Sequence, residues 1–344
     1  MVLSREEFKR SVFDRDGSKC VVCKKPAIDA HHIIDRSLWD DQGYHTNNGV
    51  SVCEKHHWDA ERTIISCDDL RKLAGIQELC YPEHFHLDEK YDHWGNIVLP
   101  NGMRVKGELF DFGNVQEMLR QAGVLDRFLK YLKYPRTYHL SDSPNLQNDD
   151  RQHPDEKFFE GKQVVASLKL DGEGTTMYPD YIHARSLDSK HHESRSWVKA
   201  LHGRLQRDIF PGWRVCGENL YAEHSIHYYN LEDYFYVFNI WNQLNFCLRI
   251  DETLEYCDLL GLHHVPIFYR GVWDREKIHQ AFLDYDTGDI KEGYVIRTEA
   301  GFYYRDYRRC TAKYVRKGHV QTSEFWMTKP VIPNDLKKAK KDGQ

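Results

Sequence analysis

The 344-residue sequence has no long apolar run. None of its segments approaches the roughly 20 consecutive apolar residues that a membrane-spanning helix needs, and it has no low-complexity tract. The N-terminal residues 1–17 are charged and lack the apolar centre of a secretory signal. We therefore expect a cytoplasmic, monomeric protein with no membrane partner, and the length favours two domains over one.

A strong excess of positive charge is also missing. The formal net charge is -5, which argues against a protein that coats nucleic acid through bulk charge. A polyanionic partner would have to be held by local patches, and two are visible. Residues 305–317 hold six basic residues and one acid with tyrosines between them, which favours contacts with nucleotides or a phosphate backbone. Residues 130–136 hold three basic residues and no acid, and could equally be an ordinary solvated surface.

Strand-like segments outnumber helical patterns after residue 90. The expected strands lie near residues 162–172, 213–221, 233–242, 292–298 and 301–316. The expected helices cover residues 194–209 and 249–262, and the polar residues 141–156 should form a loop or linker. Because strands and helices do not alternate strictly, the pattern favours an α+β fold built on antiparallel sheets over a doubly wound parallel sheet.

Five of the nine cysteines lie before residue 90. Their odd total and the expected reducing compartment favour zinc ligands or buried thiols over disulfides. Cys20 and Cys23 form one closely spaced pair, and Cys53 with His56 forms a second. Two short turns that each present two such ligands suit a tetrahedral Zn2+ site. The alternative, buried thiols beside surface histidines, explains the paired spacing less well.

The segments "DAHHIID", "TNNGVSVC" and the "HH" after Cys53 resemble the HNH family of metal-dependent nucleases, many of which have a zinc-stapled ββα-metal unit. The resemblance covers roughly residues 10–65. It implies that His31 and His57 bind the catalytic metal, that His32 activates water as a general base, and that Asn48 orients His32. A zinc-stapled module that only grips nucleic acid is the alternative.

Lys169 lies in the otherwise apolar, strand-like segment "SLKLDGEGTTMY", directly before Asp171 and Gly172. A lysine nucleophile must be neutral, which costs roughly 4.6 kcal/mol at pH 7 from an unperturbed pKa near 10.4. Burial or a nearby cation would lower that cost by lowering the pKa of Lys169. The motif K-x-D-G is short, so a lone lysine at a strand edge is the alternative.

Further segments follow Lys169 in a fixed order. They are "HARS" at 183–186, "CGENLY" at 216–221, "YVFNIW" at 236–241, "EGYVIR" at 292–297 and "AKYVR" at 312–316. Over about residues 130–330 the set resembles the covalent nucleotidyltransferases, which comprise ATP-dependent RNA and DNA ligases and messenger-RNA capping enzymes. With "KYPRTYHLSDSPNLQNDD" before them, these segments are most similar to the nick-sealing RNA ligase branch.

The resemblance implies that Lys169 attacks the α-phosphate of ATP and becomes a lysyl-adenylate. AMP then passes to a 5′-phosphate, and a 3′-hydroxyl displaces it to seal the strand. Asp171 and Gly172 would form the turn that lets phosphates approach Lys169. Lys313 would contact the α-phosphate. The last motif often reads K-x-K, but Val315 stands at its second lysine, so Arg316 and Lys317 are also candidates for this contact.

The remaining matched residues would bind the nucleotide and its metal. Glu218 would hold the ribose or a metal-bound water, and Phe238 would stack on adenine. Glu292 would bind Mg2+ or Mn2+, and Arg185 would touch the nucleotide or the nicked strand. These roles suit phosphoryl transfer, which depends mainly on positioning and on neutralised oxygens.

Four parts are therefore expected along the chain. They are a zinc-bearing HNH-like module at residues 1–90, a connecting segment and start of the ligase domain at 91–155, a nucleotidyltransferase ligase domain with ATP-grasp-like antiparallel sheets at 156–330, and a basic C-terminal tail at 331–344. Only 31 residues follow Lys313, too few for the OB domain of capping enzymes and classical DNA ligases.

We expect an ATP-dependent ligase that seals nicks in duplex nucleic acid, with an RNA strand slightly favoured over DNA. Its cofactors would be ATP, Mg2+ or Mn2+, and Zn2+, and the HNH-like module would assist binding. One alternative is a chain that also cleaves nucleic acid at the HNH-like site. Another is a catalytically inactive binding protein.

Overall fold

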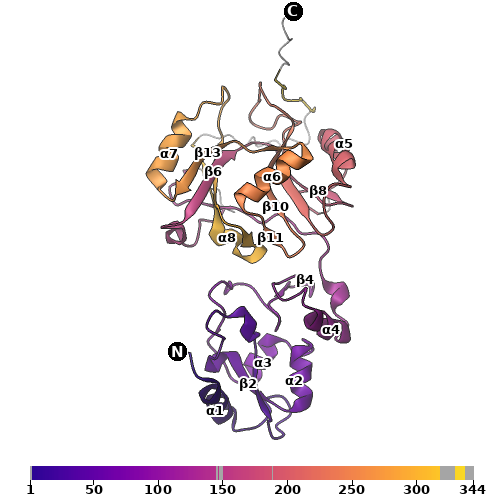
Figure 1. Cartoon of the computed structure of the whole chain (residues 1–344), viewed down its shortest axis with the longest axis vertical. Coiled ribbons are helices and arrows are strands. Elements are labelled where there is room, and N and C mark those ends of the chain that lie inside the picture. Colours follow the sequence, from indigo (N-terminus) through magenta and orange to yellow (C-terminus); the bar gives the residue numbers. More distant parts are fainter. Residues whose placement is uncertain (1, 145, 147–149, 188, 318–329, 338–344) are drawn as a thin grey trace, which may run out of the picture. The chain divides into compact units, whose positions relative to one another are not determined.

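The computed structural model describes residues 2–144, 146, 150–187, 189–317 and 330–337 (Figure 1). The chain divides into two compact units, Met1–Tyr131 and Leu132–Gln344. Both units combine helices with mostly antiparallel strands, as the sequence predicts. None of the described helices is both long enough and apolar enough to cross a membrane.

The N-terminal unit begins with a helix packed on a two-stranded sheet. Its elements are α1 (Arg5–Asp16), β1 (Asp29–His32), β2 (Gly49–Val52), α2 (Glu54–Glu61), α3 (Cys67–Leu73), β3 (Ile97–Val98), β4 (Arg104–Val105) and α4 (Gly113–Gln121). Ser4 and Glu7 form a capping box that starts α1. The buried side chains of Phe8 and Val12 then pack against the sheet, where Gly49 leaves room for them. Strands β1 and β2 pair antiparallel, with His31 opposite Val50, and α2 follows directly, giving the expected ββα order.

The N-terminal unit extends beyond the expected boundary at residue 90, because later residues pack into it. The Trp94 indole donates a hydrogen bond to the carbonyl of Glu61 at 2.7 Å. Arg104 pairs with the buried Asp92 at 2.8 Å and also donates to Thr63. The expected connecting segment at 91–155 is therefore split, since residues 91–131 belong to the first unit and residues from 132 onward to the second.

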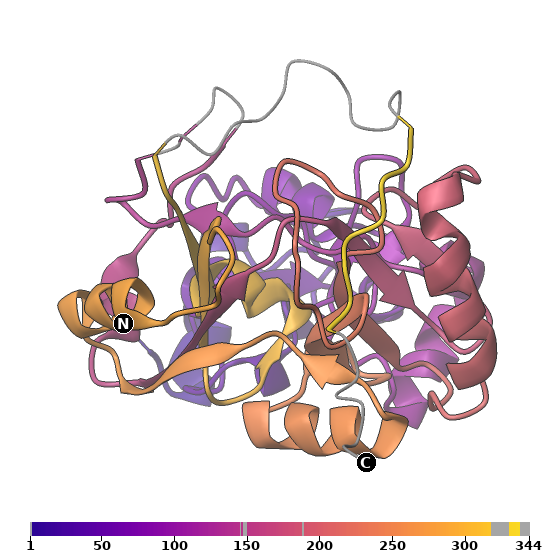
Figure 2. The same ribbon diagram turned by 90° about the horizontal axis from the view of Figure 1, so that it is seen from above.

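The C-terminal unit contains two sheets flanked by helices. The strands are β5 (Tyr138–His139), β6 (Gln163–Lys169), β7 (Glu173–Met177), β8 (Ile182–Ala184), β9 (Arg214–Asn219), β10 (Phe235–Trp241), β11 (Phe246–Cys247), β12 (His263–His264), β13 (Ile267–Val272), β14 (Gly293–Thr298), β15 (Phe302–Tyr303) and β16 (Thr311–Val315). The helices are α5 (Ser196–Leu205), α6 (Ile250–Leu260), α7 (Arg275–Asp284) and the short α8 (Tyr307–Cys310). Figures 1 and 2 show α5 and α7 at opposite sides of this unit.

One sheet has the strand order β15-β11-β10-β9-β7-β8, with β12 also paired to β10. The other has the order β13-β6-β14-β16-β5. The first sheet shares a core with α5 and α6, to which Leu201 and Cys257 contribute. The second shares a core with α7, to which Ile278 and Phe282 contribute. Because β6 and β7 lie in different sheets, the Asp171–Gly172 turn crosses from one sheet to the other.

The single strand expected over residues 301–316 is wrong. Residues 302–303 form β15 in the first sheet, and residues 311–315 form β16 in the second. The chain must turn between the two sheets, and α8 makes this turn with Tyr307 and Cys310 buried. Arg305 is buried as well, so the basic residues of 305–317 do not form one continuous exposed patch.

Residues 331–337 of the expected basic tail pack on the C-terminal unit instead. Asn334 is 2% exposed, and isolated β-bridges join Pro333 to Ala222 and Leu336 to Leu231. Residues 338–344 of that expected tail lie outside the described residues.

Candidate active site and metal centres

Lys169 and Glu292 meet at the ends of two paired strands. Lys169 is the last residue of β6 and lies opposite Gly293, the first residue of β14. The Lys169 ammonium donates to Glu292 Oε2 at 2.6 Å, and the Glu292 side chain is only 6% exposed. Two of the predicted site residues, 123 positions apart in the sequence, are thus brought into direct contact.

The ionisation of Lys169 differs from the sequence-based expectation. Burial acts to lower its pKa, but the carboxylates of Glu292 and Glu218 outweigh burial and raise the pKa above its ordinary value. Burial also raises the pKa of Glu218 to about 8, with Lys169 opposing this and Glu292 adding to it. The protein alone therefore favours a charged Lys169, which contacts Glu292 and interacts electrostatically with Glu218. A neutral Lys169 requires positive charge to arrive beside it.

Asp171 is held by a loop that sequence reasoning missed. Its Oδ2 accepts hydrogen bonds from the backbone N–H of Ser225 and Ile226 at 2.8 and 3.0 Å and from the Ser225 hydroxyl at 2.6 Å. The backbone N–H of Asp171 donates to the Tyr228 hydroxyl at 2.8 Å. No local sequence pattern predicts these contacts, because Ser225, Ile226 and Tyr228 lie more than fifty residues from Asp171 in the sequence.

Gly172 is required by the approach of a neighbouring strand. A Cβ atom built on Gly172 would lie 2.5 Å from the carbonyl oxygen of Asn219, at the end of β9. The backbone N–H of Gly172 also hydrogen-bonds to the Glu218 carboxylate. The close packing of the two backbones thus explains this glycine without reference to a bound phosphate.

Lys313 lies opposite Val295 in the β14–β16 pairing, in the same sheet as Lys169. Burial lowers the pKa of Lys313 and the charge of Lys169 lowers it further, against the opposing effect of Asp150. Asp150 Oδ1 lies 3.4 Å from Lys313 Nζ. Of the three basic candidates for the phosphate contact, Lys313 thus lies near enough to Lys169 to interact with its charge.

The remaining predicted nucleotide contacts lie on the other sheet. Phe238 is partly buried in β10, and Tyr134 packs edge-on against it at 4.9 Å between ring centroids. Glu218 lies on the adjacent β9, opposite Tyr236. Arg185 is exposed just after β8 and forms no ion pair among the described residues.

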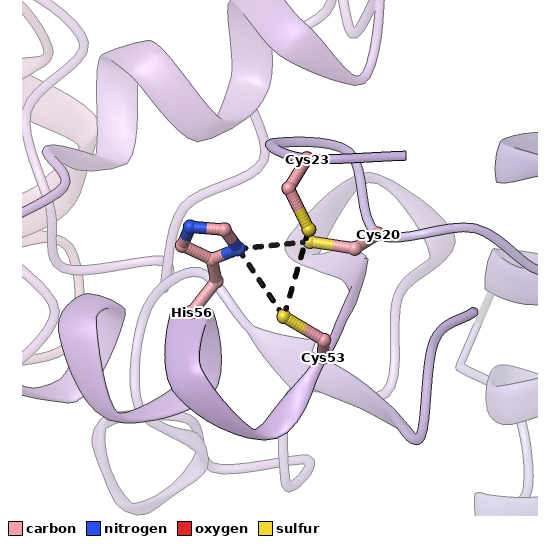
Figure 3. Close-up of side chains that lie close together, drawn as sticks. All are labelled: Cys20, Cys23, Cys53 and His56. Carbon is pink, nitrogen blue, oxygen red and sulfur yellow. Dashed lines mark hydrogen bonds between the residues drawn. The ribbon is translucent and has the colours of Figure 1, made fainter. Parts of the chain in front are cut away.

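In the N-terminal unit, the four predicted zinc ligands cluster (Figure 3). His56 Nδ1 lies 3.2 Å from the sulfur atoms of both Cys20 and Cys53, and the sulfurs of Cys23 and Cys53 are 3.8 Å apart. Zinc–sulfur bonds of ~2.3 Å in a tetrahedron give sulfur–sulfur separations of ~3.8 Å, so the residues fit Zn2+. Burial acts to raise the pKa of Cys20, but backbone N–H groups outweigh it and lower the pKa to about 6, favouring the thiolate that binds zinc.

A second cluster joins His31 and His57 with Glu61, which sequence reasoning missed. His57 lies 3.7 Å from Glu61 Oε1 and 3.3 Å from Asp29 Oδ2. Burial, with the nearby His93 and His57, keeps the pKa of His31 well below its usual value, so its ring is neutral and able to bind a metal. The four-residue spacing of His57 and Glu61 on α2 was the available signal.

His32 and Asn48 do not interact as expected. The Asn48 side chain hydrogen-bonds to the backbone of Ile34 and Gly43, and no bond to His32 is formed among the described residues. His32 stacks on Phe8 at 4.6 Å, and burial lowers its pKa to about 4. Asn48 therefore holds the loop between the strands, because its buried amide is fully used by backbone groups.

Comparison with known protein families finds a match in the central part of the C-terminal unit. Residues 162–315 match the RNA ligase family model. This match spans less than half of the chain and includes Lys169 and Lys313. No curated protein matches the sequence significantly.

Similar solved structures include RNA ligases and a putative DNA ligase. A Naegleria gruberi RNA ligase mutant with AMP and Mn is 17% identical, with a TM-score of 0.38, covering 55% of this chain and 57% of that one. An archaeal ATP-dependent RNA ligase is 14% identical, with a TM-score of 0.36 and coverages of 54% and 48%. A putative ATP-dependent DNA ligase from Aquifex aeolicus is 18% identical, with a TM-score of 0.35 and coverages of 54% and 50%. The matched part thus spans about half of each of these ligases.

Proposed function

We propose that the C-terminal unit is the catalytic domain of an ATP-dependent polynucleotide ligase in which Lys169 is the nucleophile. The 2.6 Å contact between Lys169 and Glu292, within the segment matched by the RNA ligase model, carries this proposal. This contact joins the Lys169 motif to the motif "EGYVIR" at 292–297, which follows it in the expected order. Lys313 and Glu218 lie near enough to interact electrostatically with Lys169.

The proposed first step forms a bond between Lys169 Nζ and the α-phosphorus of ATP. The bond from this phosphorus to the pyrophosphate oxygen breaks, and pyrophosphate leaves with its electron pair. The Lys169 ammonium first gives one proton to water, and the attacking amine gives up a second proton to water as the nitrogen–phosphorus bond forms. Lys313 would share the negative charge of the α-phosphate, and Phe238 would stack on the adenine.

The site fits a divalent cation, because the buried Glu292 carboxylate interacts electrostatically with a second acid, Glu218, whose raised pKa a bound cation would lower. Carboxylate oxygens are the ligands that Mg2+ and Mn2+ prefer. A bound cation would neutralise the phosphate oxygens and favour the uncharged form of Lys169.

The sealed substrate would be a nick with a 3′-hydroxyl and a 5′-phosphate, with an RNA strand slightly favoured over DNA. AMP passes from Lys169 to the 5′-phosphate, and the 3′-hydroxyl then displaces AMP as the new phosphodiester forms. The match to the RNA ligase model supports the preference for RNA. Nicked duplexes with ribose or deoxyribose on each side of the nick would measure it.

The central test uses ATP labelled at the α-phosphate together with Mg2+. The wild-type chain should form a covalent labelled adduct, and Lys169→Ala should abolish it. Lys199→Ala provides the matched control, because Lys199 is an exposed lysine on α5 of the same unit. The absence of an adduct in the wild type, or its survival in Lys169→Ala, would overturn the proposal.

We further propose that the N-terminal unit holds Zn2+ through Cys20, Cys23, Cys53 and His56 and supplies a second grip on duplex nucleic acid. The fit of the four ligand atoms to a tetrahedron supports the zinc site. Such a grip acts mainly on phosphates, so the affinity for nicked duplex should fall steeply as salt rises. If Cys23→Ser left both the affinity and its salt dependence unchanged, the grip would lie elsewhere.

The second cluster favours another candidate function, cleavage of nucleic acid. His31, His57 and Glu61 offer a donor set for a divalent metal, with His32 next to it in sequence. Supercoiled plasmid and structured RNA, incubated with Mn2+ or Mg2+ and without ATP, would reveal cleavage that His31→Ala should abolish. His45→Ala is a suitable control, because His45 lies outside this cluster. No cleavage by the wild type would rule out this activity on these substrates.

A further inference from the structure

Residues 330–337, here called the C-terminal strap, lie along the loop 220–231 (yellow in Figure 2). The backbone N–H of Glu223 donates to Ile332, and that of Asn334 donates to Tyr221. Further along the strap, the backbone N–H groups of Asp335 and Lys337 donate to Tyr228 and Leu231. The strap therefore binds both ends of this loop through its backbone.

Asn334 is the buried centre of the strap. Its Oδ1 accepts from the backbone N–H of Tyr228 at 2.9 Å, and its Nδ2 donates to the carbonyl of Leu220 at 2.7 Å. Its carbonyl accepts from the Tyr234 hydroxyl at 3.0 Å. Asn334 is only 2% exposed, and its side-chain Oδ1 and Nδ2 atoms are both hydrogen-bonded. Its side chain strongly fixes the loop, because without it the Tyr228 N–H and the Leu220 carbonyl would be buried without a hydrogen-bond partner.

The loop fixed by Asn334 is the loop that holds the nucleophile's turn. Tyr228, whose backbone meets Asn334, accepts from the Asp171 N–H through its hydroxyl. Ser225 and Ile226 of the same loop bind the Asp171 carboxylate. Asp171 lies two residues from Lys169. One hydrogen bond between Asn334 and the Tyr228 backbone and a second between the Tyr228 hydroxyl and Asp171 therefore link the strap to the turn beside Lys169.

We propose that the strap sets the position of Lys169, with Asn334 as the positioning residue, acting through Tyr228 and Asp171. The inference rests on the proposed adenylylation of Lys169. Phosphoryl transfer needs the nucleophile in line with the leaving oxygen, so a small displacement of the Lys169 turn lowers the rate of the step. The strap therefore affects the chemical step more than the binding of ATP.

The test compares full-length wild type with Asn334→Ala, using α-labelled ATP and Mg2+ in single-turnover reactions. The rate of adduct formation at saturating ATP should fall by roughly tenfold or more, while the ATP concentration for half-maximal rate changes little. Circular dichroism at the assay temperature establishes that the variant is folded.

Asn242→Ala is the matched control. The Asn242 side chain also hydrogen-bonds to the backbone: its Oδ1 accepts from the N–H groups of Leu244 and Phe246, in the turn between β10 and β11. Both variants should lower the thermal unfolding midpoint, and only Asn334→Ala should slow adduct formation. A loss of rate in both variants alike would reduce Asn334 to a general structural role and overturn the inference.

A double-mutant cycle with Tyr228→Phe tests the route. This variant removes only the hydroxyl that accepts from Asp171, so it should fold and should also slow adduct formation. If Asn334 acts through Tyr228, the double variant is barely slower than the slower single variant. Should Asn334→Ala not fold, Asn334→Ser, which keeps a hydrogen-bonding oxygen, takes its place in the cycle.

The outcomes separate the two proposals. A wild-type chain that forms no adduct overturns the proposed function itself. A wild-type adduct that forms equally fast in folded Asn334→Ala, or a change confined to the ATP concentration dependence, overturns the role of the strap and leaves the ligase proposal standing.

Discussion

The Lys169 ammonium lies 2.6 Å from the Glu292 carboxylate because β6 and β14 pair with Lys169 opposite Gly293. This register puts a lysine and an acid that are distant in sequence at the same end of one sheet. The pair has a clear consequence for ionisation. Without a bound cation, the two acids beside Lys169 keep it protonated, and the proposed reaction requires that balance to change.

Glu292→Gln distinguishes two roles of this carboxylate. If Glu292 only paired with Lys169, removing its charge would lower the pKa of Lys169, since the main group that opposes burial would be lost, and adduct formation would accelerate. Because we propose that Glu292 binds the divalent cation, we expect a fall of roughly 100-fold or more in the adenylylation rate. The comparison is Glu299→Gln, which removes a partner of Arg270 and should leave the rate unchanged.

Zinc removal should affect the two units differently. Structural zinc sites contribute about 10–16 kcal/mol in small zinc-bound domains, so Cys23→Ser should release the metal and unfold much of the N-terminal unit. The C-terminal unit has its own cores and should still form the Lys169 adduct. Metal content, near-ultraviolet circular dichroism and adduct formation measure these effects. Cys80→Ser, outside the ligand cluster, should keep its zinc, and equal loss from both variants would contradict the assignment.

Gly172→Ala should damage the site through backbone crowding. The new Cβ would meet the Asn219 carbonyl at 2.5 Å and push β9 away from the Lys169 turn. We expect a loss of about 1–3 kcal/mol in unfolding free energy, together with slower adduct formation. Gly174→Ala is a close control, because a Cβ added at Gly174 would have no heavy atom within 4 Å. Denaturant unfolding that ranks the two variants equally would refute this explanation.

The strap should make stability depend on pH. A hydrogen bond to Asp335, and then one to Glu223, raises the pKa of His227 above its ordinary 6.5. The protonated ring therefore stabilises the fold fully below about pH 6.5, and this stabilisation is lost as pH rises through the higher folded pKa. His227→Gln should lower the thermal midpoint more at about pH 6 than at about pH 8.5. Asp335→Asn should behave similarly, and an equal loss at both pH values would contradict the assignment.

Much of the local structure could be predicted because it depends on neighbouring residues. The paired spacing of Cys20, Cys23, Cys53 and His56 predicted a cluster that the fold forms, and β-branched segments predicted β6, β9, β10 and β14. The segment 301–316 was mispredicted as one strand. Local strand propensity does not reveal that the two ends of this segment pair with strands of two different sheets.

The sequence by itself determined the order of the motifs, the lone Lys169 in its strand and the two residue pairs of the Cys/His cluster, since each is a matter of residue type and short spacing. Only the tertiary structure decided that Glu61 joins His31 and His57, that Asn48 serves the backbone, and that Asn334 holds the loop around Asp171. These contacts depend on strand register and on packing between distant segments. A residue's partners across such distances are set by the fold as a whole, which no local pattern encodes.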